Sequence, residues 1–279
     1  ATLAHFVERT SYLLAVNPDL TPKWAASLRD RLHDGCNVII PPTGTLGGCR
    51  AGAHDGVDPS QNRAGSGRVS DDSTSTPVVA PDGSILYGAY TRYNYFQGHL
   101  MKFSAQGNFL GAWPFGWDMT PSVWSHDGTY SIIFKENHYG DSGSYCDVET
   151  FCPADRNANN PAYPVAFYIT QLAKNLSPEW QYRNTNTQSC TRNSNGTVTC
   201  VSDHPDGFEW CVNAAAVDVN GVVYANSEDG GLYTIRQGGT QKDHLFLNLA
   251  IGAAYTPLSI GPDGKIYTQN DGHLFVVGR

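Results

Sequence analysis

Charged side chains are scarce in this sequence, where Asp, Glu, Lys and Arg together supply 16% of the 279 residues. Acidic residues outnumber basic ones by 26 to 18, which gives a formal net charge of −8 at pH 7. The basic residues are scattered singly and form no stripe of the kind that binds phosphates. No apolar run approaches the roughly 18 residues that a membrane-spanning helix needs. We therefore expect neither a nucleic-acid partner nor a transmembrane segment.

Sequence motifs of the common enzyme classes are also missing. The chain has no Gly-x-Ser-x-Gly nucleophile elbow, no Walker loop and no Gly-x-Gly-x-x-Gly that opens a helix. Its 9 histidines include no His-x-x-x-His pair, so a zinc site is not expected. The 7 cysteines show neither the Cys-x-x-Cys spacing of zinc sites nor the Cys-x-x-Cys-His motif of covalently bound haem. No motif therefore identifies an enzyme.

Glycine, proline and aromatic residues are plentiful instead. The chain contains 29 Gly and 16 Pro, and Phe, Trp and Tyr make up 11% of it. This composition is typical of many short strands joined by tight turns, with aromatic side chains filling a wide β core. It predicts an all-β protein rather than a helical bundle.

Internal repetition is the strongest signal in the sequence. Three segments begin with Thr-Pro, continue as an apolar run and reach an Asp-Gly turn: Thr76-Pro77 to Asp82-Gly83, Thr120-Pro121 to Asp127-Gly128, and Thr256-Pro257 to Asp263-Gly264. A fourth copy has its turn at Asn220-Gly221. Strands expected at the ends of the units carry an aromatic residue at one position, namely Trp24, Trp113, Trp180 and Phe246. Four antiparallel strands in a repeat of roughly 45 residues predict a β-propeller blade. The recurring aromatic residue predicts a wedge between neighbouring blades.

The repeat resembles that of a known family. The stretch STPVVAPDGSILYGAY, followed by GHLMKFSAQGNFLGAW, resembles the repeat of PQQ-type, quinoprotein-like propellers, over residues 11–24 and most of 73–279. The resemblance implies an all-β β-propeller of four-stranded antiparallel blades, with five units recognisable and the terminal ones incomplete. No counterpart of the adjacent-cysteine pair of many quinoprotein dehydrogenases is present. We therefore expect a non-catalytic relative without bound PQQ.

Long insertions would lie on one face of this propeller. We expect a single domain over residues 1–279 with insertions at about 31–72, 137–165 and 184–210. All of them fall either between the second and third strands of a blade or between its fourth strand and the first strand of the next blade. Both types of connection emerge on the same face of a propeller, and function is commonly carried by such loops on a rigid scaffold.

The cysteines favour local disulfides within these loops. The pairs expected from proximity are Cys36–Cys49, Cys146–Cys152 and Cys190–Cys200, and Cys211 is left over. The stretch CTRNSNGTVTC predicts a hairpin with an Asn-Gly turn, across which Cys190 and Cys200 face each other. Disulfides indicate an oxidising compartment. The chain begins at Ala1 without Met, which fits a processed or truncated chain, and we expect a secreted, periplasmic or cell-surface protein.

Candidate site residues lie near the expected mouth of the central channel. Asparagine and acidic side chains there could ligate Ca²⁺, as in gluconolactonase-like propellers, or could only cap turns and hold loops; these candidates are Asn213, Asn226, Glu228 and Asn270. Ligand-binding candidates are Tyr93, Asn94, Lys135, Asn137 and Trp210. For general acid–base chemistry the candidates are His204, Glu209 and His138, with Trp210 as a stacking platform. Solvated, disulfide-anchored loops explain the same charges equally well.

Three functions are compatible with these features. The first is a non-catalytic extracytoplasmic scaffold that binds a protein or a surface polymer through its disulfide-stapled loop face. The second is a Ca²⁺-dependent enzyme of the quinoprotein or lactonase type, with its site at the channel mouth. The third is carbohydrate binding by exposed aromatic residues, namely Tyr93, Tyr95, Trp117, Tyr139 and Trp210. The absence of a catalytic motif favours the first.

Overall fold

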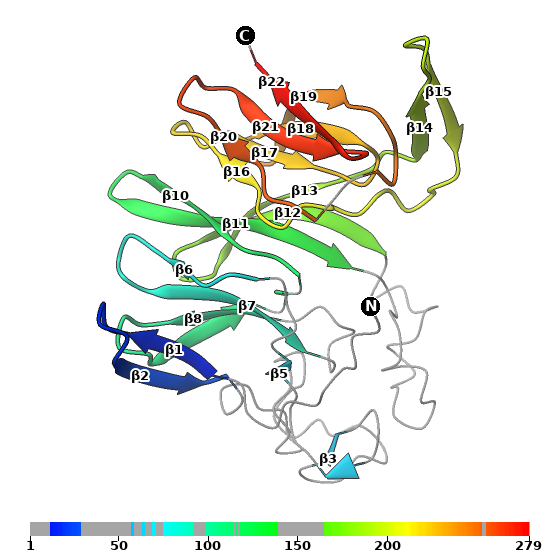
Figure 1. Cartoon of the computed structure of the whole chain (residues 1–279). Coiled ribbons are helices and arrows are strands. Elements are labelled where there is room, and N and C mark those ends of the chain that lie inside the picture. Colours follow the sequence, from blue (N-terminus) through cyan, green and yellow to red (C-terminus); the bar gives the residue numbers. More distant parts are fainter. Residues whose placement is uncertain are drawn as a thin grey trace. The chain divides into compact units, whose positions relative to one another are not determined.

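Every regular element that the structure describes is a β-strand (Figure 1). The computed structural model describes residues 12–28, 57–58, 63–64, 69–70, 75–91, 99–113, 115–116, 118–138, 165–252 and 255–278. In these ranges no helix is long and apolar enough to cross a membrane. The strands fall into two compact units, the first holding β1 to β9 and the second β10 to β22. The predicted all-β class is confirmed.

The first unit contains one complete blade and one partial blade. The complete blade is a sheet in which β6 pairs with β7, β7 with β8 and β8 with β9, with bounds Val78–Val79, Ile85–Thr91, His99–Phe103 and Phe109–Trp113. An added strand, β5 (Val69–Ser70), also pairs with β7. The partial blade is the hairpin of β1 (Tyr12–Val16) and β2 (Pro22–Ser27), as the repeat predicted. A short ladder joins β3 (Val57–Asp58) and β4 (Arg63–Ala64).

A tryptophan joins the partial blade to the complete one. The indole Nε1 of Trp24, on β2, donates to the carbonyl of Ala105 at 3.0 Å. The turn between β8 and β9 holds Gly107 at a φ of +82°, and a Cβ there would lie 2.7 Å from the Trp24 ring. A glycine is therefore required both for the backbone conformation and for the close approach of the ring. The predicted wedge role is confirmed for Trp24.

The second unit consists of three successive blades. The first is the sheet β10-β11-β12-β13, with bounds Ser122–His126, Thr129–His138, Ala166–Ala173 and Pro178–Arg183. The second is β16-β17-β18-β19, with bounds Ala216–Val217, Val223–Asn226, Gly231–Arg236 and Thr240–Phe246. The third is β20-β21-β22, with bounds Ser259–Ile260, Ile266–Asn270 and His273–Val277, and among the described residues it has no fourth strand.

The blades of the second unit are joined at both ends. At the starts of their first strands, the backbone N–H of Thr120 donates to the Asn213 carbonyl at 2.8 Å, and that of Leu258 donates to the Ala214 carbonyl at 3.2 Å. At their last strands, Trp180 of β13 repeats the role of Trp24. Its ring lies 3.2 Å from a Cβ built on Gly239, in the turn between β18 and β19. The three sheets of the second unit are thus propeller blades packed in sequence.

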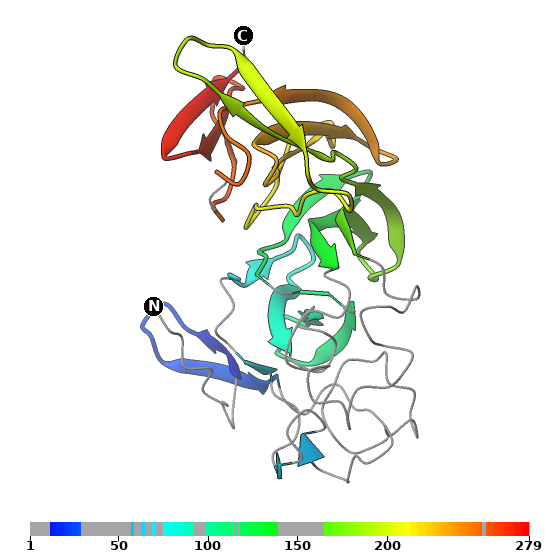
Figure 2. The same cartoon turned by 90° about the vertical axis from the view of Figure 1, so that its right-hand side faces the viewer.

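The insertion at about 184–210 forms a hairpin between β13 and β16. Strands β14 (Gln188–Arg192) and β15 (Val198–Ser202) pair antiparallel, with Cys190 directly opposite Cys200. A disulfide joins these two cysteines, as predicted. In Figures 1 and 2 the hairpin, coloured yellow-green, projects from the sheets of the second unit. Residues of the other two predicted pairs, Cys36–Cys49 and Cys146–Cys152, lie outside the described part of the chain.

Acid sensitivity of the first unit follows from the burial of His99, at the start of β8. Its side chain is fully buried, and this burial lowers the pKa of the imidazole to about 3. Below about pH 6.5 the imidazole of His99 takes up a proton in the unfolded chain but not in the folded unit. The contribution of His99 to stability is therefore complete above pH 6.5 and is lost as pH falls toward 3. We expect the free energy of unfolding to fall by about 2 kcal/mol between pH 7 and pH 5.

Denaturant titration of the wild type and His99→Gln at both pH values tests this expectation. The variant lacks the titrating ring, so its stability should depend less on pH in this window. An identical loss in both proteins would contradict the assignment to His99.

Candidate functional site

Five side chains converge in the second unit, at the end of β11 and in the segments around β17. This mouth cluster consists of Lys135, Glu209, Cys211, Glu228 and Tyr255. The ligand atoms of Glu209, Cys211 and Glu228 all lie within 4.8 Å of one another. Tyr255 donates its hydroxyl to Glu209 Oε1 at 2.7 Å, and the Lys135 ammonium lies 4.3 Å from the centre of the Tyr255 ring. Three of the predicted site residues are thus brought together: Lys135, Glu209 and Glu228.

Burial and like charge control the chemistry of the mouth cluster. Cys211 is 1% exposed, and this burial, together with the carboxylates of Glu209 and Glu228, raises the pKa of its thiol. The thiol therefore stays protonated at neutral pH and donates to Glu209 Oε1 at 3.5 Å. Burial and the neighbouring Glu209 also raise the pKa of Glu228. A protonated buried thiol is a poor nucleophile.

The donor set of this cluster differs from that of a calcium site. Ca²⁺ takes six to eight oxygen ligands, whereas the trio offers two carboxylates and one thiol. A thiolate with two carboxylates is closer to what zinc binds, and it would require the thiol to lose its proton. The Lys135 ammonium supplies positive charge beside the same carboxylates. The geometry therefore does not fit Ca²⁺ well at Glu228, and calcium at the channel mouth stays a prediction.

Asparagines at the ends of the second strands hold neighbouring backbone. Asn137, the penultimate residue of β11, is fully buried, donates to the Trp210 carbonyl at 3.2 Å and accepts from the Trp210 backbone N–H at 3.1 Å. Asn270 closes β21 and makes the same two-way contact with Leu249, at 3.0 and 2.8 Å. Both amides are therefore used in holding loops, which was the alternative to metal binding.

The other two predicted metal ligands are placed differently. Asn226 closes β17 and is 2% exposed, and its Nδ2 contacts the Gln269 carbonyl at 3.5 Å. Among the described residues, its Oδ1 has no hydrogen-bond partner. The backbone carbonyl of Asn213 accepts a hydrogen bond from the backbone N–H of Thr120.

Trp210 corrects one expectation from the sequence. It is fully buried, so it is not an exposed platform for a sugar or another ring. Its indole packs edge-on against Tyr233 at 5.1 Å between ring centres, and also lies near Tyr182. The loop of residues 203–211 turns this large apolar ring into the core, where its burial is favourable.

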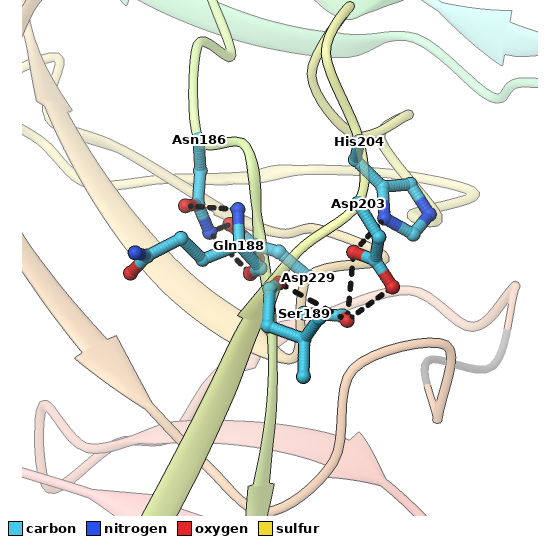
Figure 3. A network of polar contacts seen from close by, with 7 residues as sticks. Asn186, Gln188, Ser189, Asp203, His204 and Asp229 are labelled. Atoms are coloured by element: carbon cyan, nitrogen blue, oxygen red, sulfur yellow. Dashed lines mark hydrogen bonds and ion pairs between the residues drawn. The ribbon is translucent and has the colours of Figure 1, made fainter.

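A second polar group joins Ser189, on β14, to Asp203 and His204, in the segment that follows β15 (Figure 3). The Asp203 carboxylate accepts from His204 Nδ1 at 2.6 Å and from Ser189 Oγ at 2.8 Å. These hydrogen bonds, that of His204 first, lower the pKa of Asp203. In a catalytic triad the histidine lies between the serine and the carboxylate, whereas here the carboxylate lies between the other two. His204 therefore cannot take the Ser189 proton in this arrangement.

His138 has its own carboxylate partner. Its Nε2 lies 2.8 Å from Glu136 Oε1, and Glu136 is 3% exposed. The other oxygen of Glu136 accepts from Thr170 Oγ1 at 2.7 Å and from Gln181 Nε2 at 3.2 Å. Glu136 thus joins β11 to β12 and β13, and the pair has the character of a structural network.

A cavity of about 510 Å³ lies beneath the disulfide hairpin. Its walls come from β13, the following loop, β14, β15, β18 and β19, and include Tyr182, Asn186, Arg192, Asp229, Tyr233 and His244. Tyr182, Asn186, Arg192, Tyr233 and His244 were not among the candidates from the sequence. The available signal was the hairpin itself, whose Cys190 and Cys200 also line the cavity.

Cys211 and Tyr255 were likewise missed as site residues. A usable signal was their position, because both stand just before a blade's first strand, where Asn213 was selected. The candidates Tyr93 and Asn94, and the aromatic residues Tyr95, Trp117 and Tyr139, lie outside the described residues.

Comparisons with known proteins concern the fold alone. No family model matches the sequence, and no curated protein matches it. Solved structures to which the chain is similar include a protein of unknown function from Bacteroides caccae, with 8% identity over 72% of this chain and 52% of that one, at a TM-score of 0.35. BamB from Moraxella catarrhalis shows 11% identity over 74% of this chain and 58% of that one, at a TM-score of 0.31. The Dos1 propeller shows 12% identity over 95% of this chain and 62% of that one, at a TM-score of 0.36. The chain spans less than two thirds of the length of each of these three structures.

Proposed function

We propose that this chain is a non-catalytic, extracytoplasmic binding protein whose blades present the β14–β15 hairpin to a macromolecular partner. The observation that carries the proposal is the hairpin: it projects from the blades, is closed by the Cys190–Cys200 disulfide and exposes its outer strand. Disulfides persist in oxidising compartments, which supports a location outside the cytoplasm.

The inner strand of the hairpin is fixed to the neighbouring blade. The backbone N–H of Arg192 donates to the Asn248 carbonyl, and that of Ala250 donates to the Cys190 carbonyl, both at 2.8 Å. The Arg192 guanidinium adds hydrogen bonds to the carbonyls of Leu247, at 3.1 Å, and Phe246, at 3.2 Å. The hairpin is therefore held in one orientation, which lowers the entropy cost of binding a partner.

The outer strand is available for pairing. All five residues of β15 are exposed, Val201 is 65% exposed, and among the described residues β15 pairs only with β14. An open strand edge with exposed apolar side chains is a surface onto which another protein adds an extended segment. This favours a protein partner over a surface polymer for β15.

Local pairing of the candidate acid–base groups supports the non-catalytic part of the proposal. His204 and His138 are each bound to a carboxylate of their own, Asp203 and Glu136. The Cys211 thiol is buried and its raised pKa keeps it protonated, so it is not an activated nucleophile.

Photo-cross-linking from β15 tests the proposal. A photo-reactive residue placed at Val201, in the protein expressed in its source cells, should give a discrete cross-linked species after irradiation. The matched control is Val219, which is 89% exposed on the turn between β16 and β17. The same pattern of cross-links at both positions would overturn the assignment of β15 as the binding edge.

A further inference from the structure

The cavity beneath the hairpin has the size and the walls of a ligand site. Its volume of about 510 Å³ falls in the range of roughly 300–1,000 Å³ found for small-molecule pockets. Rings of Tyr182, Tyr233, His244 and Phe246 line it together with amide side chains. The hairpin covers it through Cys190 and Cys200, so the disulfide also fixes the shape of one wall.

The carboxylate of Asp229 and the guanidinium of Arg192, which both line the cavity, are already hydrogen-bonded within the protein. The Asp229 carboxylate is 2% exposed and accepts from the Tyr233 hydroxyl, from Asn186 Nδ2 at 2.9 Å and from the Gly231 backbone N–H at 2.8 Å. Arg192 donates to backbone carbonyls and lies over the Phe246 ring, 5.6 Å from its centre. An ionic ligand would therefore compete with an internal partner for either charge.

The other polar side chains at the cavity include amides and hydroxyls. Tyr182 donates its hydroxyl to Gln241 Oε1 at 2.6 Å, which orients the ring. Among the described residues, the Gln188 side-chain amide and the Thr185 hydroxyl make no hydrogen bond. The rings of half-buried Tyr182 and exposed His244 are partly accessible. Burial raises the pKa of Tyr182, so its hydroxyl keeps its proton.

We propose that this cavity binds a neutral saccharide. A pyranose ring has an apolar C–H face, which packs on an aromatic ring such as Tyr182, and a rim of uncharged hydroxyl groups. The amides of Gln188 and Gln241 and the hydroxyl of Thr185 supply both donors and acceptors for that rim. Ammonium and carboxylate ligands gain less, because Asp229 and Arg192 are already partnered.

This inference does not rest on the proposed binding edge of β15. Cys200 of β15 also lines the cavity, but Val201, which makes the proposed protein contact, does not. Loss of one function therefore leaves the other testable in the same protein.

Ligand-observed NMR with a panel of neutral cello-, malto-, xylo- and manno-oligosaccharides tests the proposal. We expect saturable binding of at least one member by the wild-type protein. Replacing Tyr182→Ala should weaken it about tenfold, since a lost ring contact is of that order. Gln241→Ala should weaken it by a smaller factor.

A matched control is Tyr267→Ala, which removes a half-buried ring on β21 that does not line the cavity and should leave the affinity unchanged. Circular dichroism of each variant shows whether it is folded, and Tyr182→Phe, which keeps the ring, should retain binding if Tyr182→Ala does not fold. The proposal fails if no neutral oligosaccharide saturates, if Tyr182→Ala binds as well as the wild type, or if Tyr182→Phe and Tyr267→Ala lose affinity equally.

Discussion

Replacing Asn137 by Ala is expected to lower the free energy of unfolding of the second unit by about 2–4 kcal/mol, because two buried backbone groups lose their partners. Asn137 is fully buried at the end of β11 and serves both the N–H and the carbonyl of Trp210. Neither group can be reached by water without opening the loop. Denaturant titration measures the change directly.

The matched control for Asn137→Ala is Asn220→Ala, in the exposed turn between β16 and β17. Its side chain is exposed, so the change should remain within about 0.5 kcal/mol. Equal effects of the two substitutions would show that the Asn137 contacts contribute nothing beyond those of a surface residue. A large loss confined to Asn137 would establish the asparagine as a structural part of the blade end.

Removal of the Cys190–Cys200 disulfide should act on the hairpin rather than on the blades. The two cysteines are 10 residues apart in sequence, and closing a loop of that size contributes about 2–3 kcal/mol. In a Cys190→Ser, Cys200→Ser variant, hydrogen exchange of the β14 and β15 amides should therefore accelerate by roughly 30–100-fold.

Amides of β18 serve as the internal reference in the same exchange experiment, because they lie in a four-stranded sheet that does not depend on the disulfide. Unchanged exchange in the hairpin would mean that the contacts of Arg192 and Ala250 hold it without the disulfide. Acceleration throughout the second unit would mean that the disulfide stabilises the blades as well.

The fold was predictable because the repeat combines independent signals. Thr-Pro starts and Asp-Gly turns give the same strand boundaries, joined by an aromatic wedge where a blade has its fourth strand. The structure places strands at these boundaries, as in β6 to β9 and β20 to β22. The hairpin of Cys190 and Cys200 followed from a local pattern of turn and strand. Short-range patterns of this kind depend on few tertiary contacts.

The candidate site was predictable only in part. Segment 203–215 has no periodic pattern, so the sequence could not indicate that Trp210 points into the core while Glu209 faces Tyr255. Asn137 and Asn270 were recognised as positions at strand ends, but the choice between metal binding and loop holding depends on distant backbone at Trp210 and Leu249. Such contacts are fixed by tertiary packing alone.

The central claim, that the disulfide-stapled hairpin is the binding surface, is tested most directly by cross-linking from Val201 with and without the disulfide. Mass spectrometry of the cross-linked product identifies the partner, and the yield is compared between the wild-type pair and the Cys190→Ser, Cys200→Ser variant. We predict one dominant protein partner and a marked fall in yield when the disulfide is absent, because the β15 edge is then no longer held extended. An equal yield from both proteins, or cross-links no more specific than those from Val219, would contradict the account.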